Sequence, residues 1–86
     1  MTEDEVRVWL VEREYTDKGM VSLVYATPDG ERAWYRQLSA NALSSGVPAA
    51  RVVDPARLTT VEGEDRERYA SEAARVADRN DPDDAL

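Results

Sequence analysis

The sequence lacks cysteine, histidine and phenylalanine, and it contains a single lysine, Lys18. Without cysteine the chain can form neither a disulfide nor a thiolate metal site. Without histidine it lacks the most frequent general base and the most frequent metal ligand. The longest strongly apolar run, Val8 to Val11, is far too short to span a bilayer, and the acidic start at Thr2 to Glu5 is unlike a signal peptide. We therefore expect a cytoplasmic protein with no cofactor, no metal and no membrane partner.

Charge is plentiful but unbalanced, because 18 acidic residues face 11 basic ones and give a net charge of -7 at pH 7. Ten of the basic residues are arginine, whose weakly hydrated guanidinium pairs with carboxylates through two parallel hydrogen bonds. With this net charge, the carboxylates repel one another when the chain is compact. Concentrated salt screens that repulsion within a few ångströms. The composition therefore indicates a cytoplasm rich in salt.

Alternation of apolar and polar residues predicts three strands in the first half, at Val6 to Arg13, Met20 to Thr27 and Glu31 to Leu38. Turn residues at Thr16 to Gly19 and at Pro28 to Gly30 separate these strands. Short turns between strands join neighbours, so the three strands are expected to form an antiparallel meander.

The second half predicts a short strand and one clear helix. Ala50 to Val53 fits a fourth strand, Asp54 to Leu58 fits a capped helical turn, and Ser39 to Leu43 fits another turn. From about Glu64 to Arg79, apolar residues recur at helical spacing. We predict an α+β fold, with an antiparallel three- to four-stranded meander sheet and one C-terminal helix packed on a face. Residues 1–80 form the single domain and residues 81–86 an acidic, disordered tail.

Strand alternation also predicts which side chains share a face of the sheet. If the first turn is a four-residue loop, Val8 lies with Tyr25 and Tyr35 on an apolar face that the helix can cover. The opposite face then gathers both tryptophans and four arginines as a candidate binding site: Arg7, Trp9, Arg13, Arg32, Trp34 and Arg36. A one-residue change in that turn would move the first strand's side chains to the other face.

Three interpretations of this tryptophan–arginine face stay open. In the first, residues 39–58 cover it and the arginines pair with nearby acids. In the second, the face is exposed and binds a protein, either a second copy as a dimer or another chain, since tryptophan and arginine dominate interface energetics. In the third, bases stack on the indoles and phosphates bind the arginines, although the acidic total opposes a polyanion.

Catalysis has little support in the sequence. Glu12, Glu14 and Glu31 could act as acid or base if they were buried, but in so charged a chain most carboxylates are solvated. We therefore predict that the protein is not an enzyme and that no small-molecule substrate is involved. The expected function is a non-enzymatic module that associates with itself or another protein through the tryptophan–arginine face. A nucleic-acid-associated accessory protein that uses the same face is the alternative.

Four segments, Val6 to Arg13, Tyr25 to Arg32, Glu67 to Ala73 and Asp81 to Asp84, resemble a family of short uncharacterised proteins from halophilic archaea. The likeness covers nearly the whole chain. It implies a salt-rich cytoplasm, in agreement with the charge, and it carries over no catalytic residues.

Overall fold

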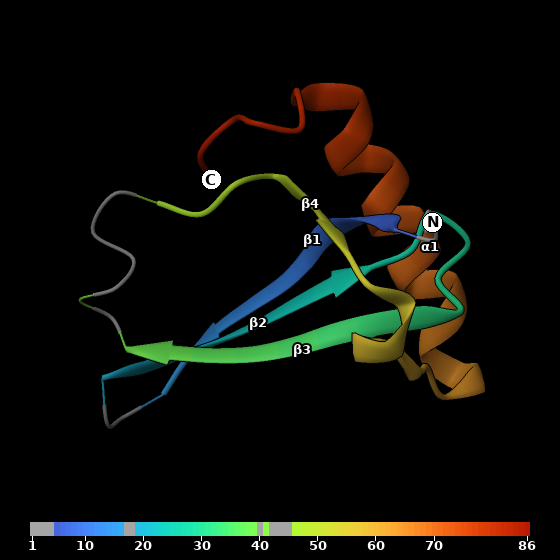
Figure 1. Cartoon of the computed structure of the whole chain (residues 1–86), viewed down its shortest axis with the longest axis horizontal. Coiled ribbons are helices and arrows are strands. Elements are labelled where there is room, and N and C mark those ends of the chain that lie inside the picture. Colours follow the sequence, from blue (N-terminus) through green and yellow to red (C-terminus); the bar gives the residue numbers. More distant parts are fainter. Residues whose placement is uncertain (1–4, 17–18, 40, 42–45) are drawn as a thin grey trace.

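A computed structural model describes residues 5–16, 19–39, 41 and 46–86 of the chain. Within these residues it contains one antiparallel sheet and one α-helix (Figure 1). The elements are β1 (Val6–Tyr15), β2 (Met20–Ala26), β3 (Arg32–Ser39), β4 (Ala50–Val53), the 3₁₀ turn η2 (Pro55–Arg57), β5 (Thr59–Thr60) and α1 (Gly63–Arg79). The predicted α+β class, with a meander and one C-terminal helix on a face, is confirmed. The two-residue strand β5 has no counterpart in the prediction.

The strand order in the sheet is β4-β1-β2-β3-β5, with every neighbouring pair antiparallel. After the β1–β3 meander, the chain returns to place β4 beside β1, and η2 then leads it to β5 beside β3. In Figure 1 the helix lies behind the strands, whereas the chain from β4 to η2 lies in front of them. We call the side packed against α1 the helix face and the other side the outer face.

Apolar residues fill both faces of the sheet. On the helix face, Tyr69 and Ala73 of α1 are buried in clusters with these sheet and loop residues: Trp9, Val24, Ala26, Ala33, Ala49, Ala50 and Val61. The outer-face cluster consists of Val8, Leu10, Val21, Leu23, Tyr25, Val47 and Val53. Trp34, Leu38 and Leu58 are half-buried against it. The outer face is therefore partly covered by residues 46–58. The prediction that the helix covers the face of Val8 and Tyr25 is wrong, because these residues lie on the outer face and α1 packs against Trp9 and Val24. Tyr35 pairs with Val24 and so lies on the helix face, apart from Tyr25.

The two tryptophans lie on opposite faces, so the prediction that they share one face is wrong. Trp9 pairs with Ala26, whereas Trp34 pairs with Tyr25. Directly paired residues on antiparallel strands point to the same side, and consecutive residues of one strand point to opposite sides. Because Tyr25 and Ala26 are consecutive, Trp9 belongs to the helix face and Trp34 to the outer face.

The cause of this error is the second turn rather than the first. Pro28 to Gly30 suggests a three-residue loop, but the Thr27 N–H donates to the Arg32 carbonyl at 3.0 Å, so the loop is 28–31. One additional loop residue exchanges the faces of all β3 side chains. The Asp29 carboxylate stabilises this longer loop, because it accepts hydrogen bonds from the Thr27 hydroxyl at 2.6 Å and the Glu31 N–H at 2.9 Å.

A bulge in β1 changes its register between Leu10 and Glu12. Before the bulge, Leu10 pairs with Tyr25, so Val6, Val8 and Leu10 share a face with Tyr25 as predicted. Beyond it, Arg13 pairs with Leu23 and therefore lies on the outer face, opposite to the face of Trp9. The predicted grouping of Arg13 with Trp9 is consequently wrong as well.

The C-terminal segment, residues 80–86, is packed against the sheet, unlike the disordered tail expected at 81–86. The Ala50 N–H donates to the Pro82 carbonyl at 3.0 Å, and the Ala49 N–H donates to the Asp84 carbonyl at 2.8 Å. Leu86 is half-buried against the clusters of both faces. The acidic composition of residues 81–86 does not indicate these backbone hydrogen bonds or the packing of Leu86. The helical turn expected at residues 39–43 lies outside the described residues.

Candidate functional site

On the outer face, the indole of Trp34 lies against two guanidinium groups. The Cζ atom of Arg36 is 4.8 Å from the ring centroid, and that of Arg51 is 5.3 Å from it. Arg36 follows Trp34 by two residues in β3, whereas Arg51 comes from the edge strand β4, which is separated from β3 by β1 and β2. Both arginines are within the range of a cation–π interaction, which holds a guanidinium in a defined position. Trp34 therefore holds two positive charges that come from its own strand and from the edge strand β4.

Tyr25 connects this group to the segment that crosses the outer face. Its ring centroid is 6.0 Å from that of Trp34, and its hydroxyl donates to the Pro48 carbonyl at 2.8 Å. Burial raises the pKa of Tyr25, while the positive charges of Arg51, Arg36 and Arg13 act in the opposite direction. Three guanidinium groups therefore lie near one buried phenol. We call Arg13, Trp34, Arg36 and Arg51 the outer-face site.

Among the described residues, the arginines of the outer-face site have no carboxylate partner. The ion pairs among the described residues involve Arg68 and Arg75, and none of them includes Arg13, Arg36 or Arg51. The chain carries 18 acidic residues that could have supplied a partner. Guanidinium groups left unpaired in so acidic a chain are available to an external anion, which they can bind through two parallel hydrogen bonds.

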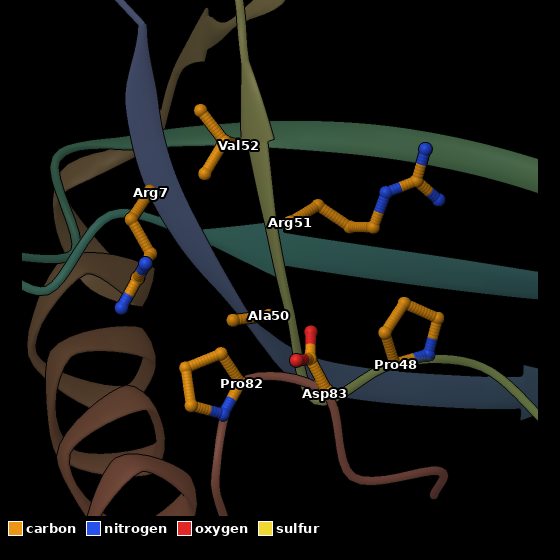
Figure 2. Close-up of a pocket in the computed structure, with 7 residues that line it drawn as sticks. All are labelled: Arg7, Pro48, Ala50, Arg51, Val52, Pro82 and Asp83. Atoms are coloured by element: carbon orange, nitrogen blue, oxygen red, sulfur yellow. The ribbon is translucent and has the colours of Figure 1, made fainter.

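Two hollows adjoin the outer-face site at its β4 end. The first, of about 370 Å³, is lined by Trp34 and Arg51 and by charged residues of both signs, among them Glu5, Asp54 and Arg57. The second, of about 280 Å³, runs along the outer edge of β4 and is lined by Arg7, Arg51 and Asp83, with Pro48 and Pro82 (Figure 2). Arg51 and Val52 line both hollows. The site is thus a shallow, open surface rather than an enclosed pocket.

The register divides the predicted site residues between the two faces. Arg13, Arg32, Trp34 and Arg36 lie on the outer face, and Arg7 and Trp9 on the helix face. Trp9 is buried against Ala73 of α1, whereas Arg7 pairs opposite Val52 at the β4 edge. Sequence analysis missed Arg51, because its only signal is a place in the possible fourth strand. Nothing in the sequence indicates that this strand pairs with β1.

A second polar cluster joins the helix to the sheet on the other face. The Glu12 carboxylate accepts a hydrogen bond from the Tyr69 hydroxyl at 3.2 Å and from Arg68 at 3.5 Å. Burial, together with the nearby negative charge of Glu12, raises the pKa of Tyr69 to about 12. Glu12, one of the carboxylates considered for catalysis, is therefore the acceptor of a helix–sheet contact.

Among the described residues, acidic side chains form no group of three that could hold a metal ion. In the same part of the chain, no helix combines the length and the apolar composition that a bilayer span requires.

The fold and site define a small α+β domain with a helix on one face of a five-stranded sheet and an arginine–tryptophan surface on the other. The chain belongs to the family of unknown function DUF7967, whose model matches residues 2–86. No curated protein and no solved structure matches the chain.

Proposed function

We propose that this protein is a non-enzymatic interaction module that binds an acidic surface of a partner protein through its outer-face site. The observation that carries the proposal is the pair of guanidinium groups of Arg36 and Arg51, which are held against Trp34 and form no ion pair within the described part of the chain. A partner carboxylate can accept two hydrogen bonds from each of them. Tryptophan and arginine are also the residues that contribute most to binding energy at protein interfaces.

The positioning of the two arginines favours binding without a large entropic cost. Arginine normally loses much rotamer freedom when it is immobilised at an interface. Here the indole of Trp34 already holds both guanidinium groups, and Trp34 is itself half-buried against the outer-face cluster. The site therefore resembles a preformed receptor for carboxylates.

The sign of the charge favours another protein over a second copy. A symmetric dimer through this face would bring like arginines toward each other, whereas a partner with acidic side chains is complementary to them. In a cytoplasm of concentrated salt, where we place this protein because of its charge of -7, other proteins carry acidic surfaces too. Association of two copies through the site is an outcome that light scattering of the free protein would reveal.

Binding to a single-stranded nucleic acid is the second candidate. Trp34 on a sheet face, flanked by arginines, offers one base-stacking platform with phosphate ligands beside it. Because Trp9 is on the helix face, the second platform that the sequence suggested is missing. We therefore rank this candidate below an acidic protein partner.

A titration with a short acidic peptide tests the proposal. The peptide repeats valine-aspartate-aspartate, and binding is followed by tryptophan fluorescence over a salt series, with circular dichroism to verify folding. Because Trp9 is buried on the helix face, we expect the change in emission to come from Trp34 and to disappear in a Trp34→Phe variant. Arg36→Ala/Arg51→Ala should weaken binding at least tenfold. The control Arg79→Ala removes an exposed arginine at the end of α1 and should bind like the wild type.

Three results would decide against the proposal. Binding that is equal in the double arginine variant and in the Arg79→Ala control would place the peptide elsewhere. If the peptide does not bind at any salt concentration at which the protein is folded, the hypothesis of an acidic partner is wrong. Binding of a short single-stranded RNA in place of the peptide would give preference to the second candidate.

A further inference from the structure

The two edges of β4 carry different backbone groups. Val8 pairs with Arg51, and the Leu10 N–H donates to the Ala49 carbonyl at 2.9 Å, so Val8 and Leu10 turn their amide groups toward β4. In an antiparallel pair, residues that exchange hydrogen bonds alternate with residues that do not. Arg51 and Val53 therefore direct their backbone groups toward β1.

By the same alternation, Ala50 and Val52 direct their backbone groups away from the sheet. The Ala50 N–H is satisfied, because it donates to the Pro82 carbonyl at 3.0 Å. The N–H and carbonyl of Val52 have no hydrogen-bond partner among the described residues, and 49% of the Val52 residue surface is exposed. An edge strand with free backbone groups is a template for a further strand.

The chain itself shows which kind of segment this edge accepts. Between Pro82 and Leu86, the C-terminal segment runs beside residues 47–50 with backbone hydrogen bonds and an antiparallel bridge between Pro48 and Ala85. This segment includes Asp83 and Asp84. Residues 82 and 83 form a turn, closed by the Asp84 N–H, which donates to the Asp81 carbonyl at 3.0 Å, and residues 84–86 continue beside residues 47–49. An acidic segment therefore already accepts a backbone hydrogen bond from the first residue of the edge, Ala50, and leaves Val52 free.

Positive charge flanks the free part of the edge on both sides. Figure 2 shows Arg7 and Arg51 on opposite sides of the β4 ribbon, with the side chain of Val52 on the Arg7 side. The hollow of about 280 Å³ along this edge leaves space beside the strand. A segment that lies there would direct alternate side chains toward Arg7 on the helix face and toward the outer face, where the Arg51 guanidinium is held over Trp34.

We propose that an extended acidic segment of a partner protein adds as a strand to the edge of β4 at Val52. Its backbone bonds the Val52 N–H and carbonyl, and its carboxylates on the helix side contact Arg7. This inference rests on the proposed function, because it concerns the same acidic partner and because Arg51, held over Trp34 in the outer-face site, also lines the hollow at this edge. It adds a backbone requirement that binding by charge alone does not have.

Amide hydrogen exchange of the wild-type protein tests this requirement. With the valine-aspartate-aspartate peptide bound, exchange of the Val52 amide should slow at least tenfold. The Ala50 amide, already bonded to Pro82, should change little. A peptide of the same sequence with N-methylated backbone keeps the carboxylates but cannot pair as a strand, and it should give no protection. Unchanged exchange at Val52 with the unmodified peptide bound would overturn strand addition.

A substitution provides an independent test. Val52→Pro removes an N–H that points away from β1, so the β1–β4 pairing should be retained, and proline is tolerated at such positions of edge strands. We expect a native circular dichroism spectrum and at least tenfold weaker peptide binding, whereas Val52→Thr keeps the N–H and should bind like the wild type. If Val52→Pro binds normally while Arg36→Ala/Arg51→Ala does not, strand addition is wrong and the proposed function stands. If the arginine variant also binds normally, the proposed function fails.

Discussion

The backbone carbonyl of Arg66 in α1 approaches Gly30 so closely that a Cβ atom at residue 30 would lie 2.1 Å from the carbonyl oxygen. Gly30 closes the turn between β2 and β3, and its φ of 73° is in the left-handed region. The glycine therefore serves two purposes: it forms the turn, and it lets the turn contact the helix.

Gly30→Ala should destabilise the protein by roughly 2–4 kcal/mol, because about 1 kcal/mol of backbone strain adds to overlap with helix backbone that cannot move freely. Gly19→Ala is a matched control, since Gly19 has a φ of 75° but nothing within 4 Å of the added Cβ. It should cost only about 1 kcal/mol. Urea unfolding of both variants measures the difference, and equal losses would contradict the close contact.

The tyrosine of the helix–sheet contact predicts a loss of stability at high pH. Burial raises the pKa of Tyr69 from 10.0 to about 12, so the folded protein keeps a proton that the unfolded chain has released. The contribution is complete below pH 10 and is lost as the pH rises toward 12, with a magnitude of roughly 2 kcal/mol. Tyr69→Phe should flatten this part of the pH dependence. Tyr15→Phe, at a position that is 65% exposed, should leave it unchanged.

The C-terminal segment should contribute to stability through its apolar residue. Leu86→Ala should cost roughly 1–2 kcal/mol, less than for a fully buried leucine, because Leu86 is half-buried. Asp81→Ala, which removes an exposed side chain from the same segment, should change the free energy of unfolding by less than about 0.5 kcal/mol. Thermal unfolding compares the two variants. Equal stability of Leu86→Ala and wild type would support the disordered tail expected from the sequence.

Salt should stabilise the fold because of its net charge of -7. Between about 0.1 M and about 1 M KCl the Debye length falls from roughly 10 Å to roughly 3 Å, which screens the repulsion among carboxylates. The melting temperature should rise over this range. Glu14→Gln/Asp78→Asn removes two exposed acids and should reduce the increase. A melting temperature independent of salt would contradict adaptation to concentrated salt.

The elements of the fold could be predicted from local patterns. The three long strands, the capped turn at Asp54 and the helix each follow from alternation, turn residues or helical spacing within one segment. Strand β5 is different, because two exposed threonines carry no apolar pattern of their own. Its pairing with Arg32 and Ala33 depends on the path of the chain after η2, which places Thr59 and Thr60 beside β3.

The candidate site could be predicted only in part, because register is not a local property. Trp34 and Arg36 were identified from their residue types, and both belong to the outer-face site. Their expected neighbour Trp9 is on the other face because a single loop residue, beyond the visible Pro28 to Gly30 signal, reverses β3. The approach of Arg51 to Trp34 depends on pairing between distant segments, which alternation within one strand does not encode.

The connection between β4 and β5 has a consequence for local unfolding. Residues 54–58 lead directly from one edge strand of the sheet to the other. Because this connection is short, separation of β4 from β1 should also weaken the pairing of β5 with β3. The amides of both edge strands should therefore exchange with solvent as one cooperative unit, separately from the central hairpins. A ligand that binds the backbone of Val52 should for the same reason also slow amide exchange at Thr59 and Thr60 in β5, at the opposite edge of the sheet.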